Sequence, residues 1–217
     1  MLPGPRCRCP GLVTYELVFV LGIDPGLSRC GYGAVRQVGG RPEVVSSGVI
    51  STAPSAELPS RLAELLVALR DLLERTVPDV VVVERVLFQA NARTAMSVGQ
   101  ASGLALVASA ERGVPVVQYS PNEVKLAVTG WGGANKEQVQ RMVQALLHLP
   151  EKPSPPDRAD ALALAICHLA VAPLAAAAER AAARGSGASA RRVGAAGRGG
   201  PSGPVGIGSR AGTGVGG

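Results

Sequence analysis

The strongest constraint on the fold is an uninterrupted run of four valines at residues 80–83, which lies between Asp79 and Glu84. Valine favours extended backbone, and a strand without polar alternation needs cover from other elements on both of its faces. Such strands are typical of parallel sheets, in which helices connect one strand to the next. The run therefore predicts a buried strand in an α/β fold.

The segments around this run predict the order of the other elements. Three strand candidates joined by short turns come first, and they indicate an antiparallel meander. A helix with leucines at helical spacing then precedes the valine run, and strand and helix candidates alternate after it. The order predicts an α/β fold whose mixed sheet has three antiparallel strands and then parallel strands, flanked by helices. The predicted strands are 18–24, 31–38, 43–51, 79–84 and 114–119. The predicted helices are 58–75, 91–112, 121–128, 136–147 and 157–170, the last of which resumes over 174–184.

A formal net charge of +6 and a pI near 9.6 hint at a polyanionic partner such as nucleic acid. The charge is unevenly distributed, because residues 171–217 carry a net charge of +5 whereas residues 21–170 are neutral. The chain from Gly185 onward also contains 13 of the 28 glycines and no aromatic residue. Such a segment buries too little apolar surface to offset its ordering entropy. We therefore expect a globular unit over roughly 18–172 and disorder from about residue 185.

The cysteines and the apolar segments bear on the cellular compartment. Cys7, Cys9, Cys30 and Cys167 have neither zinc-site spacing nor the density of a disulfide framework, so we interpret them as free thiols in a reducing compartment. No apolar stretch reaches the roughly 20 residues that span a bilayer. Glu16 interrupts the one segment that resembles a signal peptide. We expect a cytoplasmic protein with no membrane partner.

Acidic residues end two of the predicted strands and begin a predicted helix. Asp24 and Glu84 each follow an apolar strand, where a carboxylate is costly to desolvate unless a cation or hydrogen bonds offset the loss of water. Asp157 and Asp160 are three residues apart at the start of an Ala- and Leu-rich helix, so they share one helix face. Four clustered carboxylates suit Mg²⁺, which prefers oxygen ligands, and two such ions promote phosphodiester hydrolysis.

Each of these acidic residues also has a purely structural interpretation. Asp24 precedes Pro25 and Gly26, a sequence typical of a turn. Glu84 is compatible with a salt bridge at a strand end, and Asp157 with the N-cap of a helix. These interpretations explain the residues singly, whereas the recurrence of four carboxylates in an α/β order favours a shared site.

Seven short motifs over residues 18–170 occur in an order that resembles the RuvC family of Holliday-junction resolvases. They are Leu21-Gly-Ile-Asp24-Pro-Gly, Cys30-Gly-Tyr-Gly, Val83-Glu84-Arg-Val, Gly99-Gln-Ala-Ser-Gly103, Val124-Lys125-x-x-Val128-x-Gly130, Lys136-x-Gln-Val139 and Asp157-Arg-Ala-Asp160-Ala-Leu-Ala-Leu-Ala-Ile. A single motif of this kind also occurs in actin-like ATPases and other ribonuclease-H-like proteins. An actin-like ATPase duplicates its domain, and roughly 150 globular residues are too few for that.

The resemblance implies a ribonuclease-H-like fold, a homodimer and paired symmetric nicking of four-way DNA junctions in recombination and repair, with 5′-phosphate products. It assigns Asp24, Glu84, Asp157 and Asp160 as catalytic and metal-binding carboxylates. Two Mg²⁺ ions per active site are implied, and Mn²⁺ can substitute. It also implies a partnership with the RuvA–RuvB branch-migration helicase complex.

The resemblance further suggests residues that bind DNA. Lys125 and Lys136 match family lysines near the DNA backbone, although solvated surface lysines are the alternative interpretation. The family places an aromatic residue three positions after the glutamate, where this chain has Leu87, followed by Phe88. We regard both as candidate DNA contacts. Phe88 is either a wedge that stacks at the opened junction or a core residue.

The resemblance divides the chain into three parts. Residues 1–17 have no family counterpart and form an extension that a misassigned gene start would explain; residues 18–172 form the nuclease domain, and residues 173–217 an Ala-, Gly- and Arg-rich tail, largely disordered. Two alternatives stay open: a junction-binding protein that does not cleave, and another ribonuclease-H-like nuclease. The intact carboxylates argue against the first, and the motifs after Glu84 argue against the second.

Overall fold

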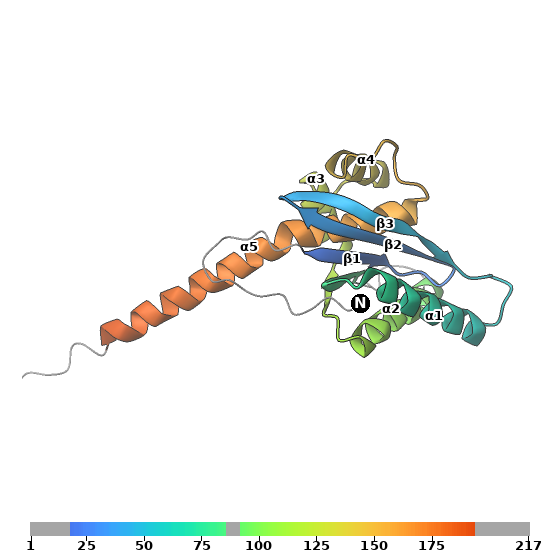
Figure 1. Ribbon diagram of the computed structural model, residues 1–217, viewed down its shortest axis with the longest axis horizontal. Helices are drawn as coiled ribbons and strands as arrows, with labels where there is room; N and C mark the ends of the chain where they lie inside the picture. Colours follow the sequence, from blue (N-terminus) through green and yellow to red (C-terminus); the bar gives the residue numbers. More distant parts are fainter. Residues whose placement is uncertain (1–17, 86–91, 194–217) are drawn as a thin grey trace, which may run out of the picture. The chain divides into compact units, whose positions relative to one another are not determined.

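The computed structural model describes residues 18–85 and 92–193 of the chain. The chain divides into two units, Met1–Ala175 and Ala176–Gly217. The first unit contains the sheet and all the elements that surround it (Figure 1).

The first unit is built on a five-stranded mixed sheet. The strands are β1 (Phe19–Asp24), β2 (Arg29–Val38), β3 (Arg41–Ser51), β4 (Val80–Glu84) and β5 (Val116–Tyr119). They lie side by side in the order β3-β2-β1-β4-β5. The first three pair antiparallel, whereas β4 pairs parallel with both β1 and β5. The predicted mixed sheet is thus confirmed.

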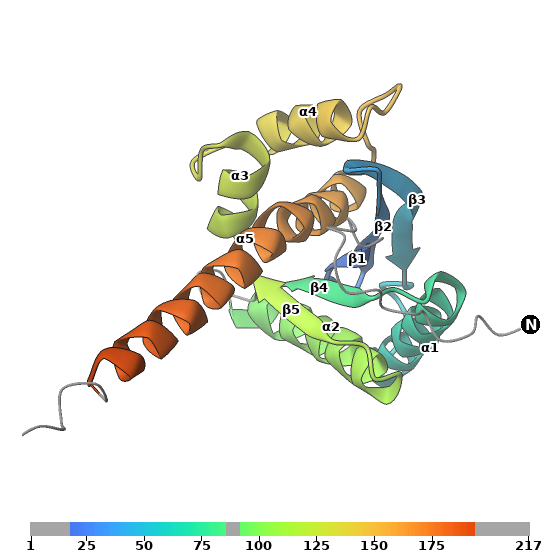
Figure 2. The same ribbon diagram turned by 60° about the vertical axis from the view of Figure 1, so that its left-hand side comes forward.

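Helices cover both faces of this sheet (Figure 2). On one face lie α1 (Leu58–Thr76) and α2 (Ala92–Glu111); on the other lie α3 (Pro121–Thr129), α4 (Lys136–Leu146) and the beginning of α5 (Pro156–Val193). The valine run shows why both layers are needed. Val80 and Val82 join the core under α3, α4 and α5, while Val81 and Val83 join the core under α1 and α2. Alternate side chains of one strand therefore bury apolar surface on opposite faces.

The beginning of α5 rests directly on the backbone of β1 and β2 because glycines leave room for it. Gly22 of β1 is paired with Gly33 of β2, and Gly31 is paired with Asp24. A Cβ atom on Gly22 would lie 2.1 Å from the carbonyl oxygen of Ala161, and one on Gly31 would lie 2.1 Å from that of Asp157. Any other residue at these two positions would push the helix away from the sheet.

The course of α5 differs from the sequence expectation. We expected a break after residue 170 and disorder from about residue 185, but the helix continues through Pro173 to Val193. Residues 175–178 and 181–183 are all alanine, the residue with the highest helix propensity, which favours continuation across the proline. The remaining tail, 194–217, and the extension, 1–17, lie outside the described residues.

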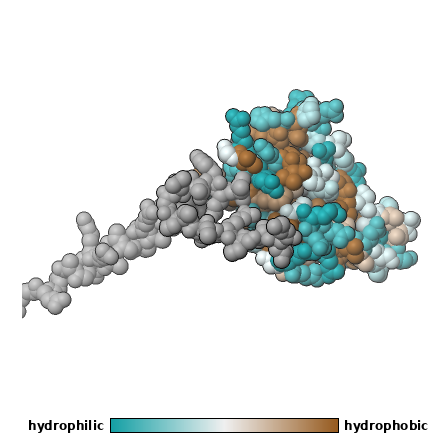
Figure 3. All heavy atoms as spheres, viewed as in Figure 1, coloured by the Kyte–Doolittle hydropathy of each residue, from teal (hydrophilic) through white to brown (hydrophobic). Residues whose placement is uncertain are grey.

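Two smaller expectations concern thiols and membranes. Cys30 and Cys167 are free and buried, as expected, while Cys7 and Cys9 lie outside the described residues. In the part of the chain that the structure covers, no helix combines the length and the apolar character that a bilayer crossing requires. Figure 3 shows apolar patches between hydrophilic side chains on one face, a mixture that is ordinary for a protein surface.

The glycine contact can be tested by adding a single methyl group. We expect Gly31→Ala to lower the free energy of unfolding by about 2–3 kcal/mol, because the new Cβ would overlap the carbonyl oxygen of Asp157. Gly99→Ala is the matched control: Gly99 lies in α2 with nothing within 4 Å of its Cβ position, so helix propensity should add roughly 1 kcal/mol. Urea unfolding measures both changes. Equal stability of the two variants would contradict the close contact of α5 with the sheet.

Candidate active site

Four carboxylates from three elements gather at one end of the sheet. Asp24 ends β1 and Glu84 ends its parallel neighbour β4, so both lie at the carboxyl ends of adjacent strands. Gly22 and Val82, two residues before Asp24 and Glu84 in their strands, both face α5. Because side chains two positions apart in a strand lie on the same face of the sheet, Asp24 and Glu84 lie on the α5 face too. Asp157 lies in the first turn of α5 and Asp160 follows one turn later, and the glycine contact holds this part of the helix against the same end of β1. The structure thus brings together all four acidic residues predicted from the sequence.

The electrostatics show how close these groups are to one another. Burial is the largest cause that raises the pKa of Asp24 to about 7, and the negative charges of Glu84, Asp160 and Asp157 raise it further. Burial also raises the pKa of Glu84 and that of Asp160. At neutral pH the four groups therefore repel one another in a poorly hydrated place.

Two cationic side chains offset part of this repulsion. Arg29, the first residue of β2, donates from Nη2 to Oδ2 of Asp157 at 2.5 Å. Lys136, the first residue of α4, places Nζ 3.6 Å from Oδ2 of Asp160. Sequence reasoning missed Arg29, because no spacing rule connects a residue after the first strand with a helix residue 128 positions later.

The donor set fits a hard divalent cation by its chemistry. All four groups are carboxylates, and a cation among them would relieve the repulsion that raises the pKa of Asp24. As the side chains stand, no three acidic, histidine or cysteine residues within 18–85 and 92–193 are grouped closely enough to hold one ion. Asp157 and Asp160 are engaged with Arg29 and Lys136 instead, so their carboxylates would have to turn toward Asp24 to complete a metal site.

The two predicted DNA-binding lysines lie beside these carboxylates. The charges of Lys125 on α3 and Lys136 on α4 both lower the pKa values of Glu84 and Asp160. Each helix starts with a reciprocal capping box, in which Ser120 pairs with Glu123 in α3, and Asn135 with Gln138 in α4. These caps fix where each helix begins and hence where its lysine projects. Leu87 and Phe88, the other two candidates, fall in 86–91, outside the described residues.

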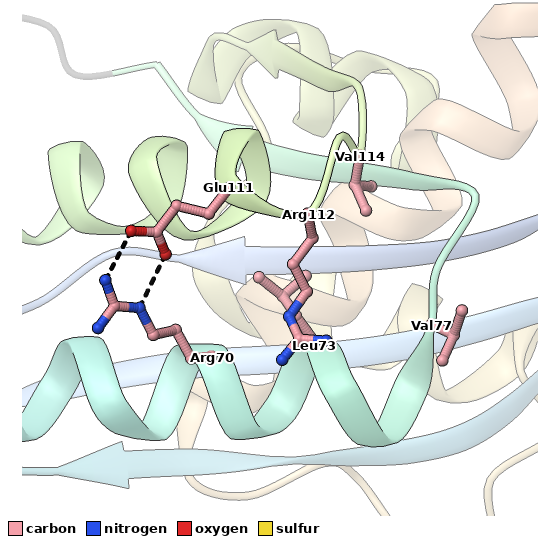
Figure 4. A pocket seen from close by; sticks show the side chains of 6 residues that line it. All are labelled: Arg70, Leu73, Val77, Glu111, Arg112 and Val114. Carbon is pink, nitrogen blue, oxygen red and sulfur yellow. Dashed lines mark hydrogen bonds and ion pairs between the residues drawn. The ribbon is translucent and has the colours of Figure 1, made fainter.

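A pocket of about 510 Å³ lies away from the carboxylates (Figure 4). It is lined by the last turns of α1 and α2 and by Val77 and Val114, which precede β4 and β5. The pocket therefore lies at the amino ends of β4 and β5, whereas Glu84 and Tyr119 lie at the carboxyl ends of these strands. Arg70 donates two hydrogen bonds to Glu111, at 2.8 and 2.6 Å, which joins α1 to α2. We assign these side chains to helix packing.

The strand order, the parallel pair at the centre of the sheet and the likeness to solved RuvC structures define the class of protein: a nuclease with a ribonuclease-H-like fold. A family model described as crossover junction endodeoxyribonuclease RuvC matches residues 20–168. The chain belongs to the RuvC family.

Similar proteins agree with this assignment. A crossover junction endodeoxyribonuclease RuvC of Salinispora arenicola is 53% identical over 173 residues, which cover 77% of this chain and 98% of the relative. One from Moorella thermoacetica is 50% identical over 157 residues, covering 72% and 93% of the two chains. The solved structure of Thermus thermophilus RuvC in complex with a Holliday junction substrate is 37% identical, with a TM-score of 0.69 over 73% of this chain and 96% of that chain.

The burial of Asp24 and the negative charges around it make the stability of the metal-free protein depend on pH. The folded-state pKa of Asp24, about 7, exceeds its ordinary value of 3.8, so the folded state keeps the proton that the unfolded state loses between these values. The free energy of unfolding should therefore fall as pH rises from about 4 to 7. Asp24→Asn removes this effect and should be more stable than the unchanged protein at pH 8 by on the order of 1–3 kcal/mol.

Chemical unfolding in a chelator, at pH 4 and at pH 8, measures this difference. Glu151→Gln, in an exposed loop, is the control and should behave like the unchanged protein at both pH values. A constant difference between Asp24→Asn and the unchanged protein across this range would mean that Asp24 is not a strained carboxylate.

Proposed function

We propose that this protein is a Holliday-junction resolvase, a structure-selective endonuclease that makes paired symmetric nicks in four-way DNA junctions during homologous recombination and repair. The single observation that carries the proposal is the gathering of Asp24, Glu84, Asp157 and Asp160 at one end of the sheet in a chain of the RuvC family. The complex of the Thermus relative with a Holliday junction substrate supports the choice of DNA structure.

The four carboxylates are the proposed metal-binding and catalytic residues. Asp24 is central, because burial and then the charges of the other three raise its pKa, so we assign it, together with Glu84, Asp157 and Asp160, to the groups that would hold two metal ions. We propose Mg²⁺ as the ion, and Mn²⁺ as a substitute that accepts the same oxygen donors. When bound, such ions lower the pKa of the attacking water and stabilise the charge that develops on the phosphate, leaving a 5′-phosphate and a 3′-hydroxyl.

Basic side chains around the site would hold the DNA. Lys125 and Lys136 are proposed to contact backbone phosphates next to the bond that is cut, and their present positions beside Glu84 and Asp160 support this role. Leu87 and Phe88 follow Glu84 closely in the chain, and we propose them as contacts to the opened junction, with Phe88 the better stacking group.

The symmetry of the proposed nicking indicates the oligomeric state of the protein. Two opposing strands are cut in a junction with two-fold symmetry, so we propose a homodimer with one active site in each protomer. A branch-migration helicase, the RuvA–RuvB complex, is the proposed partner that would deliver the junction. The nuclease domain over 18–172 and the tail over 173–217 are proposed divisions, and the cytoplasm is the proposed location because the substrate is chromosomal DNA.

A synthetic four-way junction tests the function directly. We expect the purified protein with Mg²⁺ to nick the junction in symmetric pairs and to leave a linear duplex of the same sequence largely intact. Asp24→Asn should reduce the nicking rate by at least about 100-fold yet still bind the junction, because it removes a metal ligand but no phosphate contact. Equal cleavage of the junction and the linear duplex would contradict a resolvase. Loss of junction binding by a folded Asp24→Asn variant would contradict the proposed role of Asp24.

The two lysines are tested by salt dependence. Lys125→Ala and Lys136→Ala should each weaken junction binding and each reduce the slope of log affinity against log salt by about 1, because one phosphate contact is lost. Lys152→Ala, an exposed lysine in the loop after α4, is the control and should leave the slope unchanged. Binding is measured by fluorescence anisotropy in a chelator, where cleavage is absent. Identical slopes for all three variants would assign Lys125 and Lys136 to the solvated surface.

A further inference from the structure

Trp131 is the single tryptophan of the sequence, and it is 60% exposed in the loop between α3 and α4. Tryptophan carries more apolar surface than any other side chain and is an efficient contact residue when its ring is accessible. A scattered exposed apolar residue needs no explanation in itself. The case for a role therefore depends on how the loop holds the ring and on what lies beside it.

The backbone of Trp131 is held from both sides. Its N–H donates to the hydroxyl of Thr129 at 3.2 Å, and that hydroxyl donates to the Trp131 carbonyl oxygen at 2.9 Å. The same carbonyl oxygen accepts from the N–H of Ala134 at 3.2 Å. Gly130, with φ at +75°, ends α3 and turns the chain into the loop. The residue is thus presented by a defined turn.

The ring itself lies against glycine backbone. A Cβ atom on Gly133 would lie 2.6 Å from Cζ2 and 2.8 Å from Cε2 of the indole, a distance that only glycine allows. This contact supports the benzene half of the ring without covering it. An aromatic ring that is supported in this way loses little conformational entropy when a second flat group packs on it.

The surroundings of the loop indicate what that second group is. The loop connects α3, which carries Lys125, with α4, which begins at Lys136, and both lysines act on the carboxylates of the site. Trp131 and Lys136 are five residues apart, so their Cα atoms lie within about 18 Å of each other. The loop that carries Trp131 therefore joins the two helices whose lysines act on the carboxylates of the site.

We propose that Trp131 is a stacking platform for a base of the junction strand next to the cleaved bond. The inference rests on the proposed function and deepens it, because it adds a base contact to phosphate contacts. Bases at the branch point of a junction expose their faces, and aromatic side chains bind such faces without regard to sequence. Lysines on both helices that the loop joins favour nucleic acid over an apolar protein segment as the occupant.

Tryptophan fluorescence, excited selectively at the red edge where tyrosine does not absorb, tests the contact, because Trp131 is the single tryptophan of the sequence. Titration with a synthetic four-way junction in a chelator should quench this emission, with the same midpoint as binding measured by anisotropy. Heparin, a polyanion without bases, should bind the lysines and leave the emission nearly unchanged. Saturated junction binding with no change in emission would overturn the proposal, as would equal quenching by heparin.

Substitution gives the second test. Trp131→Ala should weaken junction binding about tenfold, the scale of one stacked base, without changing the salt slope, since no charge is lost. Trp131→Phe should recover most of the affinity. Val67→Ala, 56% exposed on α1, is the control and should bind normally.

The outcomes separate this inference from the function on which it rests. Normal junction binding by Trp131→Ala, in a protein that nicks junctions, would overturn the stacking role alone. Failure of Trp131→Phe to rescue, together with a lowered melting temperature of both variants, would show a structural role and would also overturn it. Absence of junction nicking by the unchanged protein would instead overturn the proposed function.

Discussion

The contact between the backbone of α5 and the glycines of β1 and β2 is the constraint on which the site depends. It brings a helix from the far end of the globular part to within van der Waals distance of the first strand. Side chains at Gly22 or Gly31 would lift α5 and carry Asp157 and Asp160 away from Asp24. The apolar residues of α5 that follow, such as Leu162, then bury themselves against Val20 and Val35 and keep the helix in place.

That packing holds together groups that repel one another. Four carboxylates at one end of a sheet raise the free energy of the folded state, and the apolar core beneath them offsets this cost. Arg29 and Lys136 act as internal counter-ions, so the site is less negative than the acidic residues alone suggest. A domain with no net charge over 21–170 can therefore present a local site suited to cations and a rim suited to DNA.

Much of the fold could be predicted from the sequence, because apolar periodicity and turn residues determine the five strands and the helices up to α4. The carboxylates could be predicted as a group, because strand ends and a helix start converge in an α/β order, while their catalytic roles stay a prediction. The partner of Asp157 could not be predicted, since Arg29 meets it only through the packing of α5 on β2. The expected break in α5 at residues 171–173 and its expected end near residue 184 were wrong, because Pro173 and the later glycines were given more weight than the alanines around them. The glycines at 22, 31 and 33 indicate close packing of a helix on the strands, but an interpretation based on the spacing of apolar residues does not detect this signal.

Because α5 supplies two of the four carboxylates, the site can form only after the rest of the globular part has been synthesised. Asp24 and Asp160 are 136 positions apart, and a ribosome has to synthesise almost the whole globular part before they can meet. The meander β1–β3 and α1 can form early from local contacts, whereas the catalytic centre waits for the most distant pairing in the domain. A nascent chain that stalls before α5 therefore lacks two of the four carboxylates proposed as catalytic, so incomplete translation would leave the proposed site unassembled.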